Sequence, residues 1–75
     1  MTHDLAWAER VKYEYKELLD RITRLRAFLE KDPKISGTDM SFLKVQLDIM
    51  SDYADILLAR LHYHNVEIDA EGDEQ

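Results

Sequence analysis

Two long stretches of helical apolar periodicity, separated by one short break, constrain the fold of this chain more than any other feature. In each stretch, apolar residues recur at alternating steps of three and four, which places them on one stripe of a helix. The first stripe comprises Ala8, Val11, Tyr15, Leu18, Ile22, Leu25 and Leu29, and the second comprises Leu43, Leu47, Met50, Ala54, Leu57 and Leu61. A short connection between two such helices favours antiparallel neighbours whose stripes face each other.

The break between the stretches holds the only proline and one of the two glycines of the sequence. Because the residue before a proline is pushed out of helical conformation, Asp32-Pro33 should end the first helix. We therefore predict helices over about residues 4–31 and 39–64. The fold class that follows is all-α, a two-helix antiparallel hairpin.

Hydroxyl and carboxylate side chains near the predicted helix starts are candidate N-caps. Such a side chain accepts a hydrogen bond from a free backbone N–H of the first turn. Thr2 or Asp4 is expected to cap the first helix, and Thr38 the second.

The second predicted helix carries a further apolar stripe beside the first one. It comprises Phe42, Val45, Ile49, Ile56 and Tyr63, extended by Tyr53 and Leu58. A helix that is apolar over most of its circumference must be covered on more than one side, and one partner helix covers one side. We expect the hairpins to assemble into a helical-bundle homo-oligomer, and the alternative is a monomer with scattered exposed apolar groups.

Chain length and cysteine content also favour a homo-oligomer. A chain of 75 residues buries only about 60% of its unfolded surface and is marginal alone. The absence of cysteine rules out a disulfide or a thiolate metal site as a stabilising staple, which leaves association.

The net charge of −6 is concentrated at the C-terminal end, where residues 65–75 hold five acids and no base. We predict a hairpin domain over residues 1–64 and an acidic, mobile tail over residues 65–75. The charge balance argues against duplex nucleic acid as a partner, since that affinity needs many phosphate contacts. A small anionic ligand held by a few arginines remains compatible with it.

The N-terminal residues lack the basic start and apolar core of a signal peptide. No apolar run reaches the roughly 20 residues that span a bilayer. A cytoplasmic protein without a membrane partner is expected.

Catalytic and metal motifs are weak in this sequence. His62 and His64 are two residues apart, which points them to different sides of a helix and disfavours a shared metal. Glu14 and Glu17 could act as an acid–base pair, but they fit better into a charged ladder in which Glu17 pairs with Arg21. We expect no catalytic residue, no metal ligand and no cofactor.

The candidate ligand-binding residues are Arg10, Glu14, Gln46, Tyr53 and Arg60. The last three are seven residues apart and share one stripe of the second helix. They could set the register of an oligomer, or they could bind a nucleotide through an amide edge, a ring and a phosphate contact. The same choice applies to Arg21, Arg24 and Arg26, which either complement the helix dipole or clamp a phosphate.

A family resemblance covers about residues 7–61. The run Trp7-x2-Arg10-Val11-x2-Glu14-x2-Glu17-Leu18-x3-Ile22-x2-Leu25-x2-Phe28-Leu29 resembles the first helix of a family of short hypothetical proteins of tailed phages, related to a crAss-like phage gene product. The second helix matches through Gln46-Leu47-x2-Met50-x2-Tyr53-x3-Leu57-x2-Arg60-Leu61. Family members more often begin this helix with glutamates, where the present chain has Met40-Ser41-Phe42.

The chain is also similar to phage immune-signal sponges in its size, its expected oligomerisation and its lack of catalytic motifs. This similarity implies a non-enzymatic counter-defence protein in the host cytoplasm, which sequesters a cyclic oligonucleotide or cyclic ADP-ribose type signal. One alternative is an acidic protein-binding inhibitor of a host defence complex, an anti-CRISPR or nucleic-acid mimic that uses the tail with Asp48, Asp52 and Asp55. A structural oligomeric hairpin without a ligand is the other.

Overall fold

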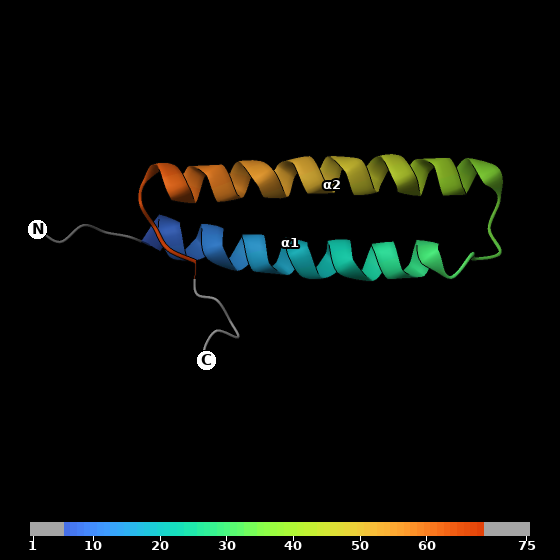
Figure 1. The fold of residues 1–75 in the computed structure, drawn as a ribbon, viewed down its shortest axis with the longest axis horizontal. Helices are drawn as coiled ribbons and strands as arrows, with labels where there is room; N and C mark the ends of the chain where they lie inside the picture. The colour runs from blue at the N-terminus through green and yellow to red at the C-terminus, as the bar shows by residue number, and fades with distance from the viewer. Residues whose placement is uncertain (1–5, 69–75) are drawn as a thin grey trace, which may run out of the picture.

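Two antiparallel helices of nearly equal length lie side by side in the computed structural model, which describes residues 6–68 (Figure 1). Helix α1 spans Ala6–Glu30 and helix α2 spans Gly37–Tyr63. This confirms the predicted all-α hairpin. The expected caps Thr2 and Asp4 of the first helix lie outside the described residues.

The two apolar stripes face each other, as the periodicity predicted. Among the described residues, the buried side chains are Ala8, Val11, Ile22, Ala54, Leu57 and Leu61. The other members of the stripes are half-buried. All three buried residues of α2 belong to its C-terminal half, so packing is tightest at the end of the hairpin away from the loop.

The loop ends α1 and caps α2 through local hydrogen bonds. The N–H of Asp32 donates to the carbonyl of Leu29 at 3.3 Å, and Asp32 adopts a positive φ of 55°. Aspartate tolerates this left-handed conformation better than most residues do. Pro33 follows at once and keeps the chain from resuming the helix.

Ser36, rather than Thr38, is the N-cap of α2. Its backbone is extended, and its Oγ accepts a hydrogen bond from the N–H of Asp39 at 3.0 Å. The prediction of Thr38 was wrong because the helix begins at Gly37, two residues earlier than expected. Thr38 therefore lies inside the first turn, where it no longer caps.

The C-terminal segment turns back over the open end of the hairpin (Figure 1). Asn65 has a positive φ of 59°, and the N–H of Val66 donates to the carbonyl of Leu61 at 2.8 Å. This left-handed turn is a Schellman-type helix end. It brings Val66 and Ile68 onto the cluster of Val11, Leu57 and Leu61.

The boundary expected at residue 65 therefore does not mark the end of contact with the hairpin. Residues 66 and 68 are half-buried and belong to its packing. The expected mobile tail otherwise falls on residues 69–75, which lie outside the described residues.

Replacement of Ser36 by alanine should destabilise the hairpin by about 1 kcal/mol, because the N–H of Asp39 loses its acceptor. In a domain of this size, that loss lowers the melting temperature by roughly 4–8 °C. Thermal unfolding followed by circular dichroism measures the change. Thr38→Ala is the matched control and should shift the transition far less; an equal shift would assign the cap to Thr38.

Candidate ligand-binding groove

A hydrogen bond between two polar side chains joins the helices near their middle. The hydroxyl of Tyr53 on α2 donates to a carboxylate oxygen of Glu14 on α1. Both residues were singled out from the sequence as candidate ligand contacts, and the antiparallel register brings them together. The contact fixes the orientation of the tyrosine ring, which keeps 44% of its surface exposed.

The pKa of Tyr53 is raised above the ordinary tyrosine value of 10.0. The main cause is its hydrogen bond to Glu14, followed by partial desolvation and by the negative charge of that carboxylate. The positive charge of Arg60 acts in the opposite direction. Tyr53 is therefore held in its protonated form, as a hydrogen-bond donor.

Two adjoining hollows flank Tyr53 and form what we call the central groove, which lies between α1 and α2. Their volumes are about 740 and 430 Å³, and they share Leu18, Arg21 and Tyr53. The larger hollow is completed by Arg24, Leu25, Gln46 and Met50, and the smaller by Tyr13, Glu14 and Glu17. Both hollows are open to solvent along one side.

The central groove is electrically polarised along its length. Arg21 and Arg24 line the hollow that contains Gln46, whereas Glu14 and Glu17 line the hollow on the other side of Tyr53. The guanidinium of Arg24 pairs with the carboxylate of Asp20 at 3.0 Å. Over residues 6–68, no carboxylate lies within ion-pairing distance of Arg21, so its guanidinium is available to an anion.

The pairing expected along the charged ladder was therefore partly wrong. Glu17 does not pair with Arg21 in the described part of the chain, and Asp20 pairs with Arg24 instead. Lys12 pairs with Glu9 at 3.1 Å, outside the groove. Arg21 and Arg24 therefore contribute to the groove rather than only to helix stability.

The five predicted ligand contacts occupy different places. Glu14, Gln46 and Tyr53 line the central groove, where the Gln46 amide donates to the sulfur of Met50 at 3.9 Å. Arg10 and Arg60 are exposed and are not part of its lining. Arg21 and Arg24 also line the central groove, although the sequence favoured a role in complementing the helix dipole. Their place in the groove follows from the antiparallel register of the two helices.

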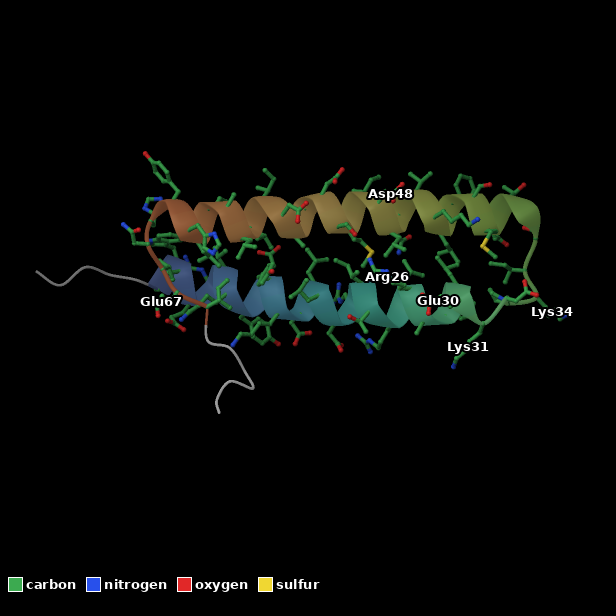
Figure 2. All side chains as sticks on the ribbon, viewed as in Figure 1. Arg26, Glu30, Lys31, Lys34, Asp48 and Glu67 are labelled. Carbon is green, nitrogen blue, oxygen red and sulfur yellow. The ribbon has the colours of Figure 1, made fainter. Side chains whose placement is uncertain are left out.

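A third hollow lies at the open end of the hairpin, with a volume of about 740 Å³. It is lined by Tyr15, Leu58, His62, Asn65, Val66, Glu67 and Ile68. Its charged residue is Glu67, and it contains no lysine or arginine, so it suits an anion less well than the central groove does. Figure 2 places Glu67 beside the N-terminal part of α1, where the chain crosses the end of the hairpin.

The histidines at the end of α2 make ring contacts. His64 packs edge-on against Trp7, with ring centroids 4.8 Å apart, and also against Tyr63. Within residues 6–68, no group of three or more metal-ligating side chains comes together. His3 lies outside the described part of the chain.

Comparison with known proteins assigns the chain to a family. A protein-family profile described as Sequestin matches residues 5–63, which is most of the chain and includes every residue of the central groove. The chain belongs to the Sequestin family. The name of the family denotes sequestration, which is a binding activity and names no reaction.

The Sequestin match ends at the last residue of α2, so the segment that packs Val66 and Ile68 onto the hairpin follows the matched region. No curated protein and no solved structure shows significant similarity to the chain. In the part of the chain that the structure describes, neither helix is long and apolar enough to cross a membrane.

Titration of Tyr53 tests its hydrogen bond to Glu14, which we call the polar bridge. Because its pKa is higher in the folded chain than in the unfolded chain, the stabilisation that the bridge provides is present below about pH 10 and is lost as the pH rises through the folded pKa. The difference in tyrosinate absorbance between wild type and Tyr53→Phe isolates this group and should show a midpoint above pH 10. Glu14→Gln should move the midpoint down, whereas Glu17→Gln should leave it in place.

Proposed function

We propose that this chain is a phage counter-defence protein that binds a nucleotide immune signal in the host cytoplasm without cleaving it. The signal is of the cyclic oligonucleotide or cyclic ADP-ribose type. The observation that carries the proposal is the central groove, which is lined by the guanidinium of Arg21, the amide of Gln46 and the ring of Tyr53. Membership in the Sequestin family supports binding as the activity.

The phosphate of such a ligand would occupy the arginine end of the groove. A guanidinium grips a phosphate through two parallel hydrogen bonds, and Arg21 has no carboxylate competing for it within the described residues. Arg24 is exposed and can turn from Asp20 toward a second phosphate oxygen. This end carries the electrostatic part of the affinity.

The nucleobase would lie against the middle of the groove. The exposed ring of Tyr53 offers a stacking surface, and Leu18, Leu25 and Met50 form an apolar floor beside it. The amide of Gln46 can donate to and accept from the edge of a base, at the cost of its weak contact to the sulfur of Met50. Glu14 and Glu17 can accept hydrogen bonds from ribose hydroxyls or an exocyclic amine.

Retention of an intact ligand fits the chemistry of these groups. A phenol whose pKa is raised stays protonated near neutral pH, so Tyr53 donates a hydrogen bond and is a poor nucleophile. Its proton is already directed at Glu14, which orients the ring before the ligand arrives. A preorganised site of this kind favours tight binding.

A second candidate function rests on the outer flank of α2. Asp48, Asp52 and Asp55 are all exposed there, and Figure 2 shows Asp48 on the side of α2 that faces away from α1. A row of carboxylates of this kind can imitate nucleic-acid phosphates toward a basic protein partner. This acidic inhibitor would act through α2 and would leave the central groove empty.

Isothermal titration of the purified protein against cyclic dinucleotides, cyclic trinucleotides and cyclic ADP-ribose isomers decides between the two. We expect at least one ligand to bind, and mass spectrometry after heat denaturation should recover it intact. Arg21→Ala should weaken binding roughly ten- to hundredfold, because it removes a charge-assisted contact. Arg26→Ala, an exposed arginine outside the groove lining, is the matched control and should bind as wild type does.

Absence of heat across the whole panel at micromolar protein would overturn the proposal. Equal weakening by both arginine variants would move the site away from the groove. Degraded ligand in the released fraction would contradict sequestration without cleavage.

A further inference from the structure

The most exposed apolar surface of the hairpin is a straight line along α2, which we call the outer stripe. It consists of Phe42, Val45, Ile49, Ile56 and Tyr63, which are 68%, 54%, 62%, 58% and 82% exposed. Steps of three, four and seven residues bring them back to nearly the same side of the helix. Contact with α1 covers none of them, because their side of α2 lies well away from the buried stripe.

The area of the outer stripe is large for so small a chain. A fully exposed aromatic side chain contributes about 150–250 Å², so the five residues together expose on the order of 600 Å². The largest apolar patch of a typical monomer is roughly 300–600 Å², and a specific interface buries at least about 1,000 Å² over both partners. Two outer stripes packed together reach that size.

The outer stripe is symmetric under reversal of the helix. Reversal about the point between Asp52 and Tyr53 exchanges Phe42 with Tyr63 and Ile49 with Ile56. The steps of three and four on one side of this point recur in the opposite order on the other, once Arg60 is counted opposite Val45. Phe42 therefore meets Tyr63, and Ile49 meets Ile56, when the stripe faces a reversed copy of itself.

We propose that two copies of the chain pair through their outer stripes, with the two α2 helices antiparallel about this point. A parallel pair would set Arg60 against Arg60 and Asp52 against Asp52, and like charges directly opposed across an interface are destabilising. The antiparallel pair instead lays the aliphatic part of Arg60 over Val45 and sets Asp52 beside Tyr53. The apolar area is the same in both arrangements, and charge selects the antiparallel one.

The antiparallel register has a consequence for the central groove, one that rests on the proposed function. Arg60 does not line the groove of its own hairpin, but it comes to lie opposite Val45 of the other copy. Gln46, which lines the groove, is the neighbour of Val45 in the sequence. Consecutive side chains of a helix point about 100° apart, so the guanidinium of Arg60 reaches the Gln46 end of the other copy's groove by extending past Val45.

Cysteine cross-linking tests the register directly, because the sequence contains no cysteine of its own. A mixture of Ile49→Cys and Ile56→Cys chains should oxidise to a mixed disulfide dimer, whereas each variant alone should remain largely uncross-linked. Ala27→Cys, an exposed position on α1, is the control and should not cross-link with either. Efficient cross-linking of Ile49→Cys to itself would show a parallel pair and overturn the proposal.

Light scattering provides a second measurement that needs neither cysteine nor ligand. The wild-type protein should have at least twice the mass of one chain, and Ile49→Asp should shift it to a single chain with its helical circular dichroism retained. A monomeric wild type over the concentration range of the titrations would overturn the interface. If Ile49→Asp unfolds instead, the cross-linking pattern still decides.

Mixing two defective variants tests the shared pocket. Arg60→Ala and Gln46→Ala should each bind the signal weakly, but a mixed dimer contains one intact pocket, so mixing should restore binding at close to one ligand per mixed dimer. Failure to restore binding would overturn the contribution of Arg60 across the interface. Cross-linked dimers that bind no nucleotide of the panel would instead uphold the interface and refute the proposed function.

Discussion

Packing between the two apolar stripes is the contact on which the rest of this structure depends. Within residues 6–68, the side chains that it buries are few and aliphatic, and no buried charge or disulfide assists them. Because the stripes pack in one register, Tyr53 of α2 lies within hydrogen-bonding distance of Glu14 of α1. The central groove therefore depends on the register of the core. A shift of one helical turn would separate Glu14 from Tyr53, and the groove would be lost.

The hydrogen bond between Tyr53 and Glu14 has a different role from the core. A single exposed hydrogen bond contributes little to stability, since both partners are well solvated when it breaks. Its effect is to hold one aromatic ring in one place between a pair of arginines and a pair of glutamates. The hairpin thereby presents opposite charges on the two sides of a stacking surface, a pattern suited to a ligand that carries both phosphates and hydrogen-bond donors.

Helical periodicity made the fold predictable, because steps of three and four specify both the helix and its buried face. Ser36 was missed because serine and threonine can both cap a helix, and the choice between them depends on which residue is the last before the helical conformation begins. Glu14, Gln46 and Tyr53 could be selected from the sequence as polar residues next to apolar stripes. The place of Arg21 and Arg24 could not, since it depends on which residues of α2 lie opposite them.

The segment that carries Val66 and Ile68 has an effect on the order in which the hairpin opens. In a bare hairpin, the end joined by the loop is held by the chain itself, and the end with the two termini frays first. Here the largest cluster of buried side chains lies at the open end and is covered by the returning chain. The gradient of protection against hydrogen exchange should therefore run in reverse, with the slowest amides of α2 near Leu57 and Leu61 and the fastest beside the loop.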